Sequence, residues 1–158
     1  MADYLIRKAN EKDIPALNKL LYEVHKVHSD VRPDLFKAGE KKYTDGELIK
    51  ILNNEKTPVF VYDDGEILGY AFTVITDHAQ DKSLMPYKNV YIDDLCVEKE
   101  CRGKGVGKKL YDFVLGFAKS IGAYNVTLNV WAGNDGALKF YEKIGMRVQK
   151  TGMEVILK

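Results

Sequence analysis

Residues 102–107, Arg102-Gly103-Lys104-Gly105-Val106-Gly107, decide the fold of this chain. Before them, residues 90–97 (VYIDDLCV) have the composition of a strand, and after them residues 108–118 (KKLYDFVLGFA) have the apolar spacing of an amphipathic helix. A glycine-rich turn between a strand and a helix directs free backbone N–H groups and the positive helix end at an anion, usually a phosphate. Positive charge at the same place comes from Lys104, Lys108 and Lys109. The pattern predicts a phosphate-binding turn, and a tight turn with solvated lysines is the alternative.

Two nucleotide-binding motifs do not fit this turn. A P-loop ends in Gly-Lys-Ser/Thr, whereas Gly107-Lys108 is followed by Lys109, which has no hydroxyl for Mg²⁺. The dinucleotide fingerprint needs a glycine three positions after Gly105, where the chain has Lys108. An acidic residue for a ribose hydroxyl is also missing about 20 residues further on. The phosphate therefore belongs to another class of ligand.

The turn resembles the pyrophosphate loop of the GNAT superfamily of acyl-CoA-dependent N-acetyltransferases. That loop follows the pattern Arg/Gln-x-x-Gly-x-Gly/Ala, and residues 102–107 match it at every fixed position. Further along, residues 126–130 alternate like a strand. The residues that follow have the spacing of the family's second motif: Asn134, Ala137, Phe140, Tyr141, Gly145 and Met146. The two motifs together cover residues 90–146.

The resemblance implies an α+β fold of three layers. Its centre is a mixed, mostly antiparallel sheet of about six to seven strands, flanked by about four helices. With 158 residues, the chain has the length of one compact domain, and we expect residues 1–158 to form a single acetyltransferase domain.

Composition narrows the partners and the compartment. The net charge is +1 with both signs mixed throughout, which argues against a nucleic-acid partner. No apolar run has the length of a signal peptide core or a membrane span. Cys96 and Cys101 are too few and too far from histidine for a zinc cluster. We therefore expect a cytoplasmic protein with reduced thiols, no metal and no membrane partner.

Local patterns predict further elements. Capping boxes at Asn10…Asp13 and Thr44…Glu47 indicate the starts of two helices. Asp64-Gly65 lies between two apolar runs and indicates a hairpin. The remaining expectations are a strand at residues 4–8, irregular chain over residues 26–43, and final strands from residues 147–158.

The strand at residues 90–97 contains a change of phase. Val90 and Ile92 are apolar at even positions, whereas Leu95 and Val97 are apolar at odd ones. Because a strand alternates its faces strictly, this slip indicates an extra, bulged residue at Asp93-Asp94. The alternative is that one aspartate faces a solvated end of the sheet. The GNAT family has a bulge here, and its following backbone groups pair with the pantetheine arm of the cofactor.

The resemblance implies direct transfer of an acetyl group from acetyl-CoA to an amine through a tetrahedral intermediate. A backbone N–H of Leu95 or Val97 would stabilise the oxyanion, and Tyr141 would supply a proton to the departing thiolate, as in the family. The alternative for Tyr141 is a packing aromatic. The implied cofactor-binding residues are Leu95, Cys96, Val97, Arg102, Gly103, Lys104, Gly105, Val106, Gly107, Lys108, Asn134, Ala137 and Tyr141. Acyl transfer through Cys101 suits the site less, because that thiol lies at the pyrophosphate end.

A general base must deprotonate the acceptor amine. Asp93 and Asp94 are the candidates, and strict strand alternation predicts that only one of them faces the acetyl group. The reserve candidates are His25, His28 and Glu98. In this fold the early helices line the acceptor side, so the candidate acceptor-binding residues are His28, Asp30, Asp34 and Phe36. Carboxylates there suit a small-molecule amine, a polyamine or a peptide amine, and a solvated mixed-charge loop is the alternative.

A second class of function shares these features. A non-catalytic acyl-CoA-binding or sensor module would keep the same turn without turnover. A homodimer is common in the family and is also compatible with this chain.

Overall fold

The structure, a computed structural model, describes residues 3–157. Its strands are β1 (Leu5–Lys8), β2 (Val59–Asp63), β3 (Ile67–Asp77), β4 (Lys88–Val97) and β5 (Asn125–Thr127). Its α-helices are α1 (Ile14–Val31), α2 (Asp45–Leu52), α3 (Val106–Ser120) and α4 (Asp135–Lys143), and its 3₁₀ turns are η1 (Glu11–Asp13) and η2 (Lys99–Cys101).

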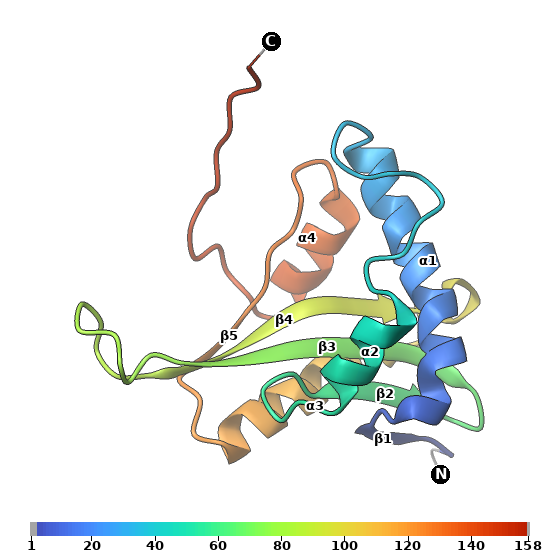
Figure 1. Cartoon of the computed structure of the whole chain (residues 1–158), viewed down its shortest axis with the longest axis horizontal. Coiled ribbons are helices and arrows are strands. Elements are labelled where there is room, and N and C mark those ends of the chain that lie inside the picture. Colours follow the sequence, from blue (N-terminus) through green and yellow to red (C-terminus); the bar gives the residue numbers. More distant parts are fainter. Residues whose placement is uncertain (1–2, 158) are drawn as a thin grey trace.

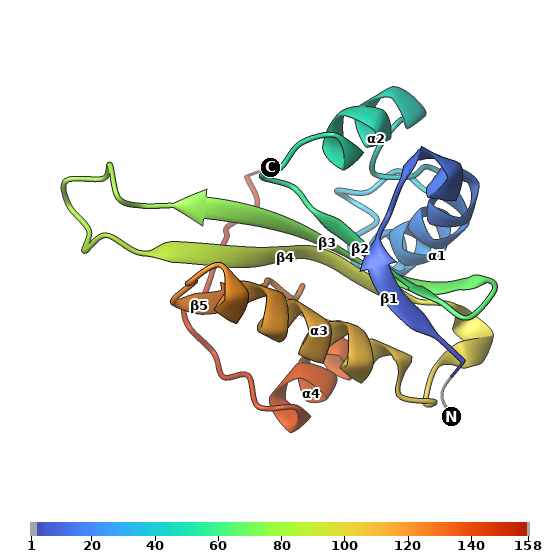
Figure 2. The ribbon, with the colours of Figure 1, turned by 90° about the horizontal axis from the view of Figure 1, so that it is seen from below.

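The five strands form one sheet in the order β1-β2-β3-β4-β5. All neighbours are antiparallel except β4 and β5, which are parallel. Helices α1 and α2 cover one face, and α3 and α4 cover the other (Figures 1 and 2). The predicted three-layer α+β architecture with a mixed, mostly antiparallel sheet and four helices is confirmed.

Each face of the sheet carries its own apolar core. On the α1 face, Leu17, Leu20 and Leu21 pack with Leu48 of α2 against the sheet residues Tyr70, Phe72 and Cys96. On the α3 face, Val90 and Ile92 pack against Tyr111 and Val114. The two cores follow from the alternation of side chains along the strands, which sends neighbouring residues to opposite faces.

Several local predictions are confirmed. Asn10 and Asp13 form a capping box at the start of η1, which leads directly into α1, and Thr44 and Glu47 form another at the start of α2. β2 and β3 form the predicted hairpin, with Gly65 at φ 107° in its turn.

The prediction of irregular chain over residues 26–43 is partly wrong, because α1 continues to Val31. A Lys26–Asp30 ion pair at helical spacing supports the extra turn, and the buried Ser29 donates its hydroxyl to the Lys26 carbonyl. The helix ends before Pro33, as expected for a residue that disfavours helix in its predecessor.

The predicted final strands are also absent from the described part of residues 147–158. Residues 147–157 form no strand, so the sheet has five strands rather than six or seven, and Lys158 lies outside the described residues. This segment leaves the body beside β5 and runs on without a turn (Figure 1). A strand needs a neighbour to pair with, and residues 3–157 do not supply one to it. None of the helices described has the length and apolar character needed to cross a membrane.

Candidate active site

The predicted bulge lies in β4. Phe72 pairs with Asp94 and the next residue of β3, Thr73, pairs with Ile92, so Asp93 is the extra residue. As a result Ile92 and Leu95 both pack into the α3-side core although they are three positions apart. The change of apolar phase in the sequence therefore has the predicted cause.

Both aspartates lie on the α1 side, which the rule of strict alternation does not allow. Asp93 accepts from Lys42 Nζ, 3.0 Å from each carboxylate oxygen, and from the hydroxyl of Tyr43. Asp94 accepts from the Tyr70 hydroxyl at 2.6 Å. Tyr43 and Tyr70 both pack against Phe72, which belongs to the α1-side core. The expectation that only one aspartate faces this side is wrong, because the bulge rotates the chain between them.

The two carboxylates differ in their electrostatic environment. Burial raises the pKa of Asp94 from 3.8 to about 6, and the hydrogen bond from Tyr70 opposes that rise. Asp93 has a cation, Lys42, in direct contact. Asp94 is therefore the carboxylate whose protonation changes near neutral pH.

The glycine-rich turn begins directly after this strand. Gly103 and Gly105 have φ of 83° and 85°, a conformation that favours glycine, and Gly105 is the N-cap of α3. Among the described residues, the N–H groups of residues 103–108 donate to no recorded hydrogen bond. Gly107 lies in α3 against Phe140, and a Cβ there would meet its ring at 3.3 Å. The turn thus presents a row of free N–H groups at the positive end of a helix, which fits a pyrophosphate.

The cations around the turn are arranged unequally. Lys108 pairs with Asp112 at 2.8 Å, and the Lys109 ammonium lies 4.6 Å from the ring centre of Tyr4. The Arg102 side chain donates to the Val97 carbonyl at 3.3 Å, which fixes the turn to the end of β4. Lys108 keeps 59% of its side chain exposed, so it remains accessible to a ligand at the turn.

Strands β4 and β5 separate beside the bulge. They pair only over Asn89–Tyr91 and Asn125–Thr127, and beyond Tyr91 no described strand lies on that side of β4. The side of β4 that faces away from β3 therefore has no strand partner at residues 95–97 among the described residues. We call this unpaired stretch, which lies in the chain between the aspartate pair and the glycine-rich turn, the opening between β4 and β5.

Tyr141 packs on the α3 face of the sheet, near this opening. Its ring centre lies 6.5 Å from that of Tyr111 and 5.1 Å from that of Phe140. Burial, and then the negative charge of Asp94, raise the pKa of Tyr141 above its ordinary value. In the part of the chain that the structure describes, its hydroxyl makes no recorded hydrogen bond, so the group stays protonated and free to donate.

Asn134 makes a capping contact within the chain, and its contact with the cofactor stays a prediction. Its side-chain oxygen accepts from the N–H of Ala137 at 3.3 Å and so caps α4. This capping bond leaves the amide nitrogen of the side chain available to a ligand.

A profile of known sequences now decides the family. The model of the protein family described as Acetyltransferase (GNAT) family matches residues 21–146 of the chain. The chain belongs to the GNAT family. This match covers the bulged strand, the glycine-rich turn and the helix that carries Tyr141.

Individual relatives agree with this GNAT membership. A glucosamine 6-phosphate N-acetyltransferase from Arabidopsis thaliana is 41% identical over 56 residues, which are 35% of this chain and about a third (36%) of that protein. The enzyme of the same name from Trypanosoma brucei brucei is 26% identical over 158 residues, 99% of this chain and 98% of that one. The crystal structure of a tetramutant of the BH1408 protein from Bacillus halodurans is 30% identical, with a TM-score of 0.92 over 97% of this chain and 99% of that one.

The structure brings two of the four predicted acceptor residues together. Phe36 packs against His28, with ring centres 5.3 Å apart, and against His25 and Trp131, each 5.6 Å away. Burial, and then the charge of Lys42, lower the pKa of His28, so its imidazole is neutral at neutral pH. His25 is hydrogen-bonded to the Lys37 carbonyl at 2.7 Å.

The other two predicted acceptor residues are occupied elsewhere. Asp30 pairs with Lys26 on the exposed side of α1, at 2.8 Å. Asp34 pairs with Arg32 through two hydrogen bonds of 2.9 and 2.8 Å. Neither carboxylate has a recorded contact with Asp93 or Asp94. The structure thus does not join the four carboxylates into one cluster.

Sequence reasoning missed Glu23. This residue of α1 is half-buried, and its Oε2 atom is buried without a recorded partner among the described residues. It lies close enough to Cys96 for its charge to raise the pKa of that thiol. The available signal was its position three residues after the buried Leu20, on the inward side of the helix.

Cys96 is a core residue, as predicted. It is 4% exposed and packs in the α1-side core, and burial raises the pKa of its thiol to about 12. Such a thiol stays protonated, so it is not a nucleophile. Its contribution to a ligand site is therefore its backbone in β4.

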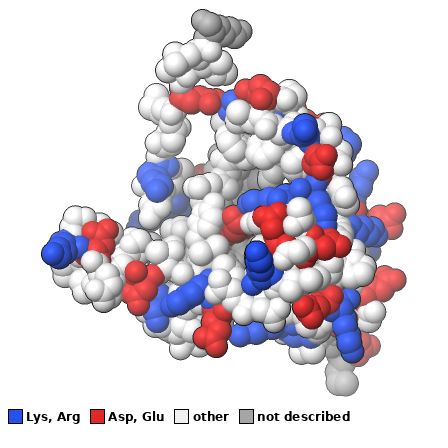
Figure 3. Space-filling model, viewed as in Figure 1, with Lys and Arg blue, Asp and Glu red and all other residues white. Residues whose placement is uncertain are grey.

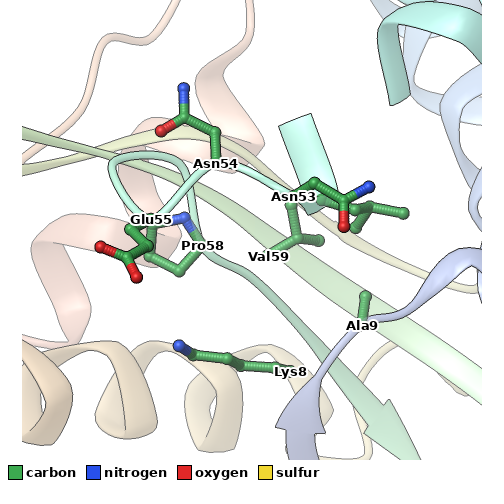
Figure 4. A pocket seen from close by; sticks show the side chains of 8 residues that line it. Lys8, Ala9, Asn53, Asn54, Glu55, Pro58 and Val59 are labelled. Atoms are coloured by element: carbon green, nitrogen blue, oxygen red, sulfur yellow. The ribbon is translucent and has the colours of Figure 1, made fainter. Parts of the chain in front are cut away.

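A separate hollow of about 100 Å³ lies between β1, the end of α2 and the start of β2 (Figure 4). It is lined by Lys8, Asn53 and Glu55 among others, and it contains none of the residues of the bulge or the turn. The candidate active site of this GNAT protein is instead the opening between β4 and β5.

Proposed function

We propose that this GNAT protein is an N-acetyltransferase that transfers an acetyl group from acetyl-CoA directly to an amine. The observation that carries the proposal is the row of unpaired N–H groups at residues 103–108, next to the bulged strand and the opening beside it. When bound, acetyl-CoA supplies an acyl group that is already activated as a thioester. The protein then needs to hold the donor, orient the amine and move protons.

Donor binding follows from the order of groups along β4 and α3. The N–H groups of residues 103–108 bind the pyrophosphate oxygens, and Lys108 adds charge nearby. The backbone of residues 95–97 holds the pantetheine arm in the opening between β4 and β5, with Asn134 and Ala137 on its other side. An N–H of Leu95 or Val97 stabilises the negative oxygen that develops during transfer.

Proton transfer is assigned to two side chains on either side of the opening. Asp94 takes a proton from the amine, directly or through water, because with a pKa of about 6 it is mostly ionised at neutral pH and still basic. Tyr141 donates a proton to the departing sulfur, since its raised pKa keeps the hydroxyl protonated. Asp93, held by Lys42 and Tyr43, contributes negative charge that attracts a protonated amine.

The acceptor is a primary amine on a small molecule or a peptide. Carboxylates at Glu23, Asp93 and Asp94 favour a cationic group, and the aromatic cluster of Phe36 and Trp131 supplies an apolar wall beside it. The names of the two curated relatives add amino sugars to the acceptors worth testing.

The experiment is a binding titration with acetyl-CoA followed by a CoA-release assay on a panel of polyamines, amino sugars and peptide amines. Gly105→Glu places a charge and a strained residue at the turn, and we expect acetyl-CoA affinity to fall at least about tenfold. The matched control, Gly116→Glu, puts the same charge on α3 at a position where an added Cβ would meet no atom within 4 Å. The affinity of this variant for acetyl-CoA should not change.

The outcomes separate the two classes of function. Binding with turnover on any amine supports the enzyme. Binding without turnover on the whole panel supports the non-catalytic module instead. Equal affinity of the Gly105→Glu and Gly116→Glu variants would contradict the placement of the pyrophosphate at the turn.

A further inference from the structure

Lys42 brings a primary amine of the chain itself to the aspartate pair. Its Nζ atom lies 3.0 Å from each carboxylate oxygen of Asp93 and 5.4 Å from the ring centre of Tyr43. Among the ion pairs recorded within residues 3–157, this is the one that reaches either aspartate of the pair. A carboxylate and an aromatic ring together favour a bound ammonium group. Lys42 thus presents its amine to the carboxylates that the proposed function assigns to the acceptor.

The segment that carries Lys42 combines a fixed backbone with a mobile side chain. Lys42 lies in the connection between α1 and α2, and 45% of its side chain is exposed. The next residue, Tyr43, is partly buried and packs against Phe72, with ring centres 5.6 Å apart. This anchored neighbour keeps the backbone of Lys42 in place, whereas the flexible alkyl chain of a lysine leaves its ammonium group free to rotate. The amine can therefore move away from Asp93 without a change in the fold.

The other lysines of this connection are placed differently. Figure 3 shows acidic and basic side chains mixed over the face that carries α1 and α2. Lys41 donates to Asn18 and Asp45, and 14% of its side chain is exposed. Lys37 is exposed. In the part of the chain that the structure describes, neither of these two lysines has a recorded hydrogen bond to the aspartate pair, so contact with the site distinguishes Lys42 from both.

The charge of Lys42 also reaches the proposed base. Burial raises the pKa of Asp94 to about 6, and the hydrogen bond from Tyr70 and then the charge of Lys42 oppose that rise. Burial, and then the charge of Lys42, lower the pKa of His28 on the other side. Because such effects weaken with distance, the ammonium lies close to both groups. One chain therefore holds an amine, the carboxylate that binds it and the carboxylate that would deprotonate it.

We propose that Lys42 is an acetyl acceptor within its own chain, so that the protein modifies itself at this residue. This inference rests on the proposed acetyl transfer. The Lys42 nitrogen attacks the thioester carbon, a C–N bond forms, and the C–S bond to CoA breaks. The ammonium loses two protons: Asp94 takes one, and the other replaces the proton that Tyr141 gives to the CoA sulfur. The products are an amide at Lys42 and free CoA.

Two properties follow from an acceptor that belongs to the chain. Transfer needs no second protein molecule, because the donor and the amine are held on the same one. The reaction stops at one acetyl group per chain, since the Lys42 amide has neither charge nor nucleophilicity. Asp93 then loses its cation, as expected when a lysine is acetylated.

The first test is mass spectrometry of the wild-type chain after incubation with acetyl-CoA and no other amine. Cleavage before aspartate gives one peptide, residues 34–44, that contains Lys37, Lys41 and Lys42, and fragmentation of this peptide locates the acetyl group. We expect Lys42 to be acetylated at least about tenfold faster than the other two, because its amine is held at the site. Exposure alone would favour Lys37, so it gives the opposite order.

The second test separates transfer within the chain from other routes. The rate constant at Lys42 should not depend on protein concentration. Asp94→Asn should lower it by about 100-fold and leave the slow chemical acetylation of Lys37 unchanged. Lys41→Arg is the matched control and should acetylate Lys42 at the wild-type rate. A rate constant that rises with protein concentration, or one that is equal in wild type and Asp94→Asn, would overturn the proposal.

The CoA-release assay on the amine panel, run in parallel, keeps this inference apart from the proposed function. Turnover on the panel with Lys42 acetylated no faster than Lys37 overturns this inference and leaves the proposed function intact. Fast acetylation of Lys42 without turnover on the panel supports this inference and makes Lys42 itself the acceptor. Absence of both reactions overturns both proposals.

Discussion

Asp93 and Asp94 are chemically identical neighbours that the fold makes different. Asp93 has a cation, Lys42, and a phenol, Tyr43, as partners. Asp94 has one phenol, Tyr70, and its burial favours the protonated acid. A single extra residue in a strand has therefore placed side by side one carboxylate that contacts a cation and one whose pKa burial raises to about 6.

The stability of the protein should increase when Asp94 is made neutral. A carboxyl whose folded pKa is raised from 3.8 to about 6 opposes folding above pH 6 and has no effect below about pH 3.8. Asp94→Asn should therefore raise the free energy of unfolding at pH 7.5 by up to about 3 kcal/mol. Urea unfolding at several pH values measures the difference, which should shrink as the pH falls towards 4. A loss of stability at pH 7.5 would show that the ionised form is the one the fold requires.

The activity of the same variant should decrease. If Asp94 accepts the proton, kcat/KM of the wild type falls as the pH decreases through about 6, because the base becomes protonated. Asp94→Asn should lower kcat by about 100-fold or more. It should also remove the acidic limb of the pH profile, which is the fall of kcat/KM below about pH 6. Asp93→Asn is the matched control, and it should keep the limb but move it to lower pH, because the charge of Asp93 helps to raise the pKa of Asp94. An unchanged limb in Asp94→Asn assigns it to another group.

Tyr141→Phe tests the proposed proton donor. The substitution removes only a hydroxyl that has no recorded partner, so packing against Tyr111 and Phe140 should remain. We expect kcat to fall by about 10- to 100-fold while acetyl-CoA affinity stays within about twofold. Tyr111→Phe is the control for loss of a nearby phenol. Equal kcat in wild type and Tyr141→Phe removes this residue from the mechanism.

At the level of single residues, the resemblance named His28 and Phe36 as candidate acceptor residues, and the structure packs their rings together. His28 lies in the part of α1 that the sequence analysis expected to be irregular. Sequence reasoning did not foresee that Lys42 would reach Asp93, or that Tyr70 would reach Asp94, because these contacts join positions far apart in sequence. Asp30 and Asp34 were proposed as acceptor residues since nothing in the sequence shows that Lys26 and Arg32 bind them.

Helix α3 depends on the conformation of the turn that precedes it. Gly105→Ala should destabilise the protein by about 1 kcal/mol, because its φ of 85° is unfavourable for a residue with a Cβ. Gly116→Ala, in the exposed middle of the same helix with an ordinary φ, should stabilise it by about 0.5–1 kcal/mol. Thermal unfolding of both variants shows directly whether each substitution raises or lowers the stability of the protein. Two shifts of the same sign would mean that helix propensity alone decides the result.

At the level of elements, the strand–turn–helix unit was predictable because its signals are local and agree with each other. The apolar phase slip in β4 predicted the bulge, which the pairing of β3 with β4 confirms. The direction of the bulged side chains was not predictable, since it depends on the twist that the neighbouring strand imposes. The final strands were expected over residues 147–158, but residues 147–157 pair with no described strand, and the sequence does not show which neighbour a segment will have.

The two edges of the sheet are finished differently. At the β1 edge, Arg7 donates to Asp13 at 2.8 and 2.9 Å and to Asp63 at 3.2 and 3.1 Å, which joins β1 to η1 and β2. At the other edge, β5 pairs over three residues and is bordered by a hollow. The β1 edge is therefore held to its neighbours by an ion-pair network, whereas the β5 edge borders a hollow.

Loss of the hydrogen bonds that Arg7 donates to Asp13 and Asp63 should measurably destabilise the protein at the β1 edge. Arg7→Lys keeps the charge but cannot form the paired hydrogen bonds, and we expect a loss of about 1–2 kcal/mol in urea unfolding. The difference should narrow at acidic pH, because Arg7 lowers the pKa of Asp13 and the pair is lost in both proteins once that carboxylate is protonated. Lys26→Gln removes an exposed pair and should cost less than about 0.5 kcal/mol. Equal losses of unfolding free energy in the two variants would show that the Arg7 hydrogen bonds stabilise the protein no more than an exposed ion pair does.

The extra residue in β4 also limits how this sequence can change in length. Deleting Asp93 would remove the bulge and leave Ile92, Leu95 and Cys96 on their present sides, because Asp94 would then follow Ile92 in continuous register with β3. Insertion of one residue between Leu95 and Val97 would instead move Val97 to the α1 face. Loops such as residues 78–87 can gain or lose residues without this inversion. Among homologous genes, we therefore expect gaps to collect in those loops and, within the ten codons of β4, to occur only at the bulge.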